Sequence, residues 1–196
     1  MTREDSTAMT VVERALCDHF GHDPVRASIA FLGLEPIEVL RFEPIPGEVA
    51  YLSLGMSRRP MSAASGSSVE IVPTHGPRAE LMLHVREDGA HADAWRQLGV
   101  LAAAPAVEGV VYSPGMTVDL GQPLAAGSRC TGVVVLESAI SPIDSVGGPV
   151  IVFAATPATS TELAFSRVHG SGALRERWSN QLIDLLDLGR RSADLG

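Results

Sequence analysis

The sequence predicts an α+β fold in which a mixed, mainly antiparallel sheet is flanked by helices. Strand-like segments are clustered along the chain instead of alternating strictly with helical ones, which distinguishes this plan from a doubly wound α/β fold. Two unbroken apolar runs rich in valine, at 130–136 and 150–155, are typical of strands that are buried on both faces. A chain of 196 residues with a hydrophobic fraction of 45% is long enough to bury one substantial core.

The N-terminal part of the chain predicts one helix followed by three strands. Apolar residues recur at helical spacing from Thr10 to Phe20, and Gly21 is suited to end that helix in a left-handed cap. Three short segments follow that are apolar or alternating and are separated by glycine and proline turns, at 27–32, 37–42 and 49–54. We expect these three strands to form a meander.

The middle of the chain predicts a loop, a strand and a second helix. The small residues at 62–68 are expected to form a mobile surface loop between two strands. Alternation of apolar and polar residues in 80–85 predicts a strand, which Asp88-Gly89 ends. Residues 92–104 predict a helix, and we expect Pro105 to stop it.

The last third predicts further strands and then helices. Prolines and glycines in 110–127 favour one or two strands broken by turns over any helix. Thr159 or Ser160 can cap a short helix together with Glu162. A final amphipathic helix is predicted over 172–188.

One domain accounts for most of the chain. We expect it to span residues 25–188, with the helix of residues 1–24 packed on it and a frayed tail at 189–196. The sequence shows no internal repeat, and the serine-rich stretch is interpreted as a loop within the domain instead of a linker between domains.

Charge and cysteine content exclude several classes of protein. The net charge of −8 would repel nucleic acid and anionic membranes. All 15 basic residues are arginine, which we interpret as codon bias instead of selection for anion binding. Cys17 and Cys130 belong to no CxxC pair, so we expect two reduced, buried thiols and neither a zinc site nor a disulfide framework. An acidic N-terminus and the lack of a long apolar run predict a cytoplasmic protein.

The turn Gly55-Met56-Ser57 begins like the nucleophile elbow of a hydrolase. That motif requires a glycine two residues after the serine, and Arg59 stands there. We therefore interpret the segment as a strand end that turns on Gly55. A small hydrolase-like enzyme or ligand-binding protein that uses Ser57 with His75 or His84 stays open as the alternative.

No residue pattern predicts a metal ion or a cofactor. His19 and His22 are spaced like ligands on one helical turn, but Gly21 between them breaks the helix. The glycines around Ser171 precede a predicted helix, yet the chain has no lysine for a phosphate-binding loop and no GxGxxG pattern.

Glu80 lies on a strand that should be at least half buried, and a buried carboxylate needs a partner. Arg78 is its neighbour on the same face, and Arg58 or Arg59 could reach it across the sheet. We expect a structural ion pair instead of an acid catalyst, because no second carboxylate is paired with Glu80.

An order of short motifs links these segments. A strand from Tyr51 ends in Gly-Met-Ser, Pro60-Met61 follows, and a strand of the Glu-Leu-Met-Leu type begins at Glu80. Further along come a helix with Trp95 and, later, a Gly- and Pro-rich turn, an apolar strand that ends before Pro142, and a strand that leads to a helix with Glu162. Over roughly residues 25–180 this order resembles that of the Suppressor of fused-like domain family, in its bacterial branch.

The resemblance implies a mixed α/β domain without known enzymatic activity. Animal relatives bind and restrain a transcription factor of Hedgehog signalling by gripping an extended peptide, and bacterial relatives resemble proteins proposed to act as immunity proteins beside toxins. The matched motif residues are expected to be structural: Tyr51, Gly55, Met56, Ser57, Pro60, Glu80 and Leu81.

We therefore expect a non-catalytic domain that binds a protein partner, such as an immunity protein that neutralises a toxin or a regulator that sequesters its target. The acidic chain would suit a basic partner through steering that weakens with salt. Arg58 and Arg59, at the base of the loop 58–68, are expected to form part of the interface, and exposed edge strands could add a partner segment. A structural subunit of a larger assembly is a third possibility, and a large exposed apolar patch would be its sign.

Overall fold

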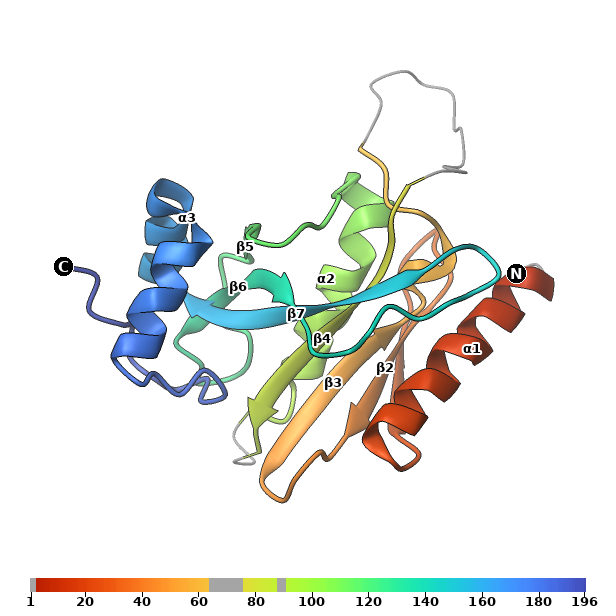
Figure 1. Ribbon diagram of the computed structural model, residues 1–196, viewed down its shortest axis with the longest axis horizontal. Helices are drawn as coiled ribbons and strands as arrows, with labels where there is room; N and C mark the ends of the chain where they lie inside the picture. The colour runs from red at the N-terminus through yellow and green to blue at the C-terminus, as the bar shows by residue number, and fades with distance from the viewer. Residues whose placement is uncertain (1–2, 64–75, 88–90) are drawn as a thin grey trace.

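A single seven-stranded sheet organises this computed structural model, which describes residues 3–63, 76–87 and 91–196 (Figure 1). In chain order the elements are α1 (Arg3–Phe20), β1 (Val25–Ile29), β2 (Ile37–Phe42), β3 (Glu48–Leu54), the 3-10 helix η1 (Met56–Arg58), β4 (Arg78–Arg86), α2 (Ala94–Glu108), β5 (Thr117–Asp119), β6 (Cys130–Glu137), β7 (Val150–Thr159) and α3 (Ser160–Asn180). The strand order across the sheet is β1-β2-β3-β4-β7-β6-β5. Every neighbouring pair is antiparallel except β4 and β7, which run parallel, so the predicted α+β fold with a mixed, mainly antiparallel sheet is confirmed.

The strands of the first half form the predicted meander, because β1, β2, β3 and β4 pair in chain order. β1 lies two residues earlier than predicted, and α1 begins seven residues earlier than Thr10. Gly21 ends α1 with a φ of 76°, and its N–H donates to the Cys17 carbonyl at 2.8 Å. The predicted loop at 62–68 and the turn at Asp88-Gly89 lie almost entirely outside the described residues.

Helices cover both faces of the sheet because successive strand residues point to opposite sides. On one face α1 packs Val12 and Leu16 against strand residues such as Leu40. On the other face α2 packs Leu98 against strand residues such as Leu81. The helix α3 lies at the end of the molecule opposite α1 (Figure 1) and forms a third, smaller apolar cluster.

Pro105 lies inside α2, so the prediction that it would stop this helix is wrong. A proline has no N–H to donate, which leaves the carbonyl of Leu101 without its helical partner. The hydroxyl of Tyr112 donates to that carbonyl at 2.7 Å, and both residues are buried. The helix therefore continues to Glu108 and ends at Gly109, whose φ is 68°.

The helix α3 begins as predicted and ends earlier than predicted. Thr159 forms a capping box in which its side chain accepts the N–H of Glu162, while the Glu162 carboxylate accepts the N–H of Thr159 at 2.9 Å. A kink at Gly170 separates two helical segments, where the sequence predicted a short helix and then a longer one. The second segment ends at Asn180 and not at residue 188, because the chain turns there.

The segment after Gly189 was expected to fray, and that prediction is wrong. Arg190 is almost fully buried and forms a two-pronged ion pair with the fully buried carboxylate of Glu162, at 2.7 Å and 2.9 Å. The Trp178 indole N–H and the Ala193 backbone N–H also donate to that carboxylate, at 2.9 Å and 3.0 Å. Burial by itself would raise the pKa of Glu162, but Arg190 and the backbone N–H donors outweigh it and hold the pKa below its usual value.

Replacing Arg190 with methionine is expected to lower the free energy of unfolding by about 3–5 kcal/mol, because it leaves the Glu162 carboxylate buried without a cation. Since the pKa of Glu162 is lowered in the folded protein, its contribution to stability is present above the ordinary carboxyl pKa of about 4.3 and is lost as pH falls through the folded value. The deficit measured by urea unfolding should therefore shrink in acid. Arg191→Met, at an exposed neighbour, is the control, and equal midpoints for the two variants would contradict the prediction.

Replacing Tyr112 with phenylalanine is expected to cost about 1–3 kcal/mol, because the buried carbonyl of Leu101 then has no donor. In a Pro105→Ala background the helix regains the missing N–H, so the same replacement should cost less than about 1 kcal/mol there. A double-mutant cycle by denaturant unfolding measures the difference. Equal costs in the two backgrounds would show that the hydroxyl does not substitute for the helical donor.

Candidate functional site

The buried carboxylate of Glu80 holds the turn that follows β3. Its Oε1 accepts the backbone N–H groups of Gly55 and Ser57 at 2.9 Å and 3.0 Å, and the Ser57 hydroxyl at 2.6 Å. Its Oε2 accepts the hydroxyl of Ser53. The predicted ion pair is wrong, because four uncharged donors satisfy this carboxylate and no arginine of the described residues pairs with it.

Arg78 holds the same turn through its carbonyl groups. One guanidinium nitrogen, Nη1, donates to the carbonyls of Ser57 and Arg58 at 2.7 Å and 2.6 Å. The Nε atom donates to the carbonyl of Gly147 at 2.9 Å, which ties the turn to the segment before β7. Arg78 and Glu80 are two residues apart on β4 and share a face. The Glu80 carboxylate therefore binds the amides of the turn, and the Arg78 guanidinium binds its carbonyls.

The turn itself requires a glycine. Gly55 has a φ of 131°, which side-chain-bearing residues rarely adopt, and a Cβ there would lie 2.7 Å from the Arg58 guanidinium. The other matched motif residues of this region, Tyr51, Met56, Pro60 and Leu81, are all buried. These motif residues are therefore assembled into one packed unit that leaves only the arginines after Ser57 near the surface.

The hydroxyl of Ser57 is placed differently from that of a hydrolase nucleophile. Ser57 is 1% exposed, and its hydroxyl donates to a carboxylate instead of a histidine. His84 lies on β4 with its Nε2 atom 2.9 Å from the carboxylate of Glu48. His75 lies outside the described residues. No described histidine meets Ser57 as the enzyme alternative requires.

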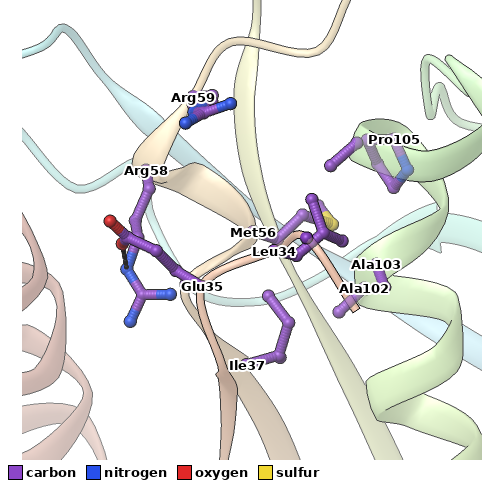
Figure 2. Close-up of a pocket in the computed structure, with 12 residues that line it drawn as sticks. Leu34, Glu35, Ile37, Met56, Arg58, Arg59, Ala102, Ala103 and Pro105 are labelled. Carbon is purple, nitrogen blue, oxygen red and sulfur yellow. Dashed lines mark ion pairs between the residues drawn. The ribbon is translucent and has the colours of Figure 1, made fainter. Parts of the chain in front are cut away.

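A cavity of about 270 Å³ opens beside this turn. Figure 2 shows side chains from the loop at 33–35, from the start of β2, from η1 and from the C-terminal half of α2 around it. Most of its wall is apolar and consists of Leu34, Ile37, Met56, Ala102, Ala103 and Pro105. The sequence pattern missed the contribution of α2, and the signal that could have revealed it is the proline inside an otherwise helical segment.

The two arginines at the rim of the cavity differ in the contacts that their guanidinium groups make. Arg58 donates to the carbonyl of Pro36 at 2.6 Å, and its Nε lies 3.4 Å from the carboxylate of Glu35 (Figure 2). Arg59 is exposed, and no partner for its guanidinium lies within the described residues. Figure 2 shows Arg59 beyond the ion pair of its neighbour, so it is the rim cation that can meet another molecule.

The structure also bears on a metal site, a membrane span and the two cysteines. In the described segments, no cluster of three or more His, Cys, Asp or Glu side chains is placed to hold a metal ion. No described helix combines the length and apolar character needed to cross a membrane. Cys17 and Cys130 are unpaired, Cys17 is only partly buried, and burial raises the pKa of Cys130 to about 11.

Comparison with known proteins places these features in context. A family model described as Suppressor of fused protein (SUFU) matches residues 33–191. A putative SUFU homolog from Neisseria gonorrhoeae is similar in structure, with a TM-score of 0.69 and 18% identity over 97% of this chain and 98% of that one. No significant match was found among curated proteins.

Two further solved structures share the fold. A Sufu–Fu complex has a TM-score of 0.68 and 13% identity over 95% of this chain and 92% of the other. Drosophila Suppressor of fused has a TM-score of 0.68 and 14% identity over 95% of this chain, but only 51% of its own length is covered.

Replacing Glu80 with alanine is expected to lower the free energy of unfolding by at least about 3 kcal/mol, because it leaves several buried donors without an acceptor. Glu80→Gln keeps an oxygen that can accept the N–H groups of Gly55 and Ser57, so it should cost clearly less. Urea unfolding of both variants at neutral pH measures the two costs. A glutamine variant as unstable as the alanine variant would show that the negative charge, and not the acceptor geometry, holds the turn.

Proposed function

Because this chain belongs to the Suppressor of fused family, we propose that it is a non-catalytic domain that binds a protein partner. The family predicted from the order of motifs is confirmed by the match over residues 33–191. One of the similar structures is a Sufu–Fu complex, in keeping with a binding role. The burial of Ser57 and its bond to Glu80 also support binding over hydrolysis.

The observation that carries the proposal is the exposed guanidinium of Arg59, which has no partner among the described residues and lies beside an apolar cavity. Around this turn, two other arginines already donate to main-chain carbonyls: Arg58 to that of Pro36, and Arg78 to two carbonyls of the turn. Arg59 is the remaining rim arginine, and a bound chain can offer its guanidinium a carbonyl acceptor in place of water. The partner segment therefore inserts an apolar side chain among Met56 and its neighbours and offers its backbone to Arg59.

The size of the cavity suits an anchoring side chain of a larger partner. Sites for small ligands usually enclose about 300–1,000 Å³, and this cavity holds about 270 Å³. That volume suits one or two apolar side chains of a larger partner. Such a buried anchor inside a polar rim is the usual arrangement of the residues that dominate a protein interface.

The proposed partner is basic as a whole, for example a toxin that this domain neutralises or a regulator that it sequesters. The net charge of −8 would steer a basic protein toward the domain and would repel nucleic acid. We place the encounter in the cytoplasm, where the Cys130 thiol stays reduced.

Affinity capture from a lysate of the source organism, at low and at high salt, is expected to recover a stoichiometric basic protein that is lost at high salt. With that protein purified, Arg59→Ala should weaken binding about tenfold without changing the melting temperature, because Arg59 has no described partner in the fold. Ala106→Phe, at an exposed residue of the cavity wall, should weaken binding by obstructing the cavity.

Arg129→Ala is the matched control, since Arg129 is also exposed and lies outside the cavity wall. Titration calorimetry on the three variants separates the outcomes. If Arg59→Ala and Arg129→Ala reduce the affinity equally, the partner senses net charge and not this cavity. Recovery of this protein alone from the lysate would argue against the binding role itself.

A further inference from the structure

The end of α3 places a leucine where the backbone favours glycine. The N–H of Ile183 donates to the Trp178 carbonyl at 3.0 Å, and the N–H of Leu182 donates to the Ser179 carbonyl at 3.2 Å. These two bonds form a Schellman motif, whose first residue beyond the cap is usually glycine because its φ is positive. Leu182 has a φ of 51° and is the one non-glycine residue with positive φ among those the structure describes.

The Leu182 side chain gains nothing from the described fold that would offset this strain. It is 90% exposed, whereas the apolar contact that supports the motif comes from Ile183 and Trp178, which belong to the apolar cluster of α3. Neither the local backbone nor the core therefore selects a leucine here. A contact with another molecule would do so, because burial of an exposed leucine is favourable.

A groove of about 680 Å³ lies beside this leucine. Its apolar lining consists of Leu136 at the end of β6, Trp178, Ile183, Leu185 and one side of Leu182 itself. Arg175 and Glu176 also line it, and both are exposed. Neither has a salt-bridge partner within the described ranges, so the groove combines apolar side chains with one cation and one anion that are unpaired there.

We propose that this surface joins two copies of the chain through a two-fold axis. A two-fold interface brings one patch against itself, so any projection on the patch must meet a hollow of the same patch, and any charge must meet an opposite charge of the same patch. Leu182 is the projection and the groove beside it is the hollow. Arg175 of one copy would pair with Glu176 of the other copy.

The charge balance favours a second copy over another occupant. A chain with a net charge of −8 repels its own copies over most of its surface. A patch in which one arginine and one glutamate are both unpaired is neutral and complementary to itself. A strongly basic or acidic partner would leave one of these two charges facing a like charge.

The association would leave the cavity beside η1 accessible. The groove is built on α3 and β6, at the end of the molecule opposite α1, whereas the cavity lies between η1 and α2 (Figure 1, Figure 2). A dimer joined through Leu182 therefore presents two partner sites, and self-association can be tested on the purified protein alone.

Sedimentation equilibrium of the purified chain across micromolar concentrations is expected to show a monomer–dimer equilibrium. Leu182→Asn keeps a residue that tolerates positive φ and removes the apolar side chain, so it should raise the dissociation constant at least about tenfold. Leu32→Asn, at another fully exposed leucine, should leave the constant unchanged. A wild-type chain that stays monomeric at every concentration, or equal effects of the two variants, would overturn the proposal.

Two further variants separate association from folding. Leu182→Gly removes the backbone strain together with the projection, so it should weaken the dimer while raising the melting temperature of the dilute monomer by about 2–4 °C. Arg175→Glu should weaken the dimer, and the double variant Arg175→Glu/Glu176→Arg should restore it. A double variant as weak as the single one would show that these side chains do not meet across the axis.

Discussion

The arrangement of the site depends on one buried carboxylate. Glu80 is fully buried, and a carboxylate in that position requires hydrogen-bond donors wherever it lacks a cation. The donors come from the end of β3 and from the turn after it, and Gly55 is the residue that lets the chain curl tightly enough to supply them. Once that turn is fixed, Met56 faces the core and Arg59 faces solvent. The cavity and the exposed guanidinium at its rim are thus consequences of the hydrogen bonds that satisfy Glu80, a strand residue of β4.

The second buried carboxylate is satisfied in a different way, with a different result. Glu162 binds a cation, Arg190, that is 28 residues away in the sequence. Because the bond reaches so far along the chain, it fixes the C-terminal segment against the start of α3. Glu80, in contrast, binds neutral donors and leaves the nearby arginines available for main-chain carbonyls. The same functional group therefore holds the C-terminal segment against α3 in one place and shapes a turn followed by an exposed arginine in the other.

The sequence predicts the parts of the fold that local patterns determine. Alternation of apolar residues identified β4, unbroken apolar runs identified β6 and β7, and Thr159 with Glu162 identified the start of α3. Prediction from the sequence failed where a contact with a distant residue overrides the local pattern. Tyr112 supplies the donor that Pro105 lacks, and the ion pair of Arg190 with Glu162 holds a segment whose composition is that of a loose tail. For the candidate site, the exposed position of Arg59 followed from its place after the strand. The donors that satisfy Glu80 and the part of the cavity wall contributed by α2 did not follow from local patterns, because both depend on tertiary packing.

The unusual features of the chain are of two kinds, and the difference bears on function. Natural sequences agree with their fold at most positions, and departures from local rules tend to mark strained or functional sites. The proline inside α2 and the carboxylate without a cation are departures that neighbours within the chain compensate, so they serve the fold. The exposed leucine with positive φ has no compensation in the described residues, and the exposed guanidinium of Arg59 has no protein partner there. Surface side chains without a partner in the fold are where another molecule can add contacts, and these two lie on separate parts of the molecule, beside η1 and beyond α3.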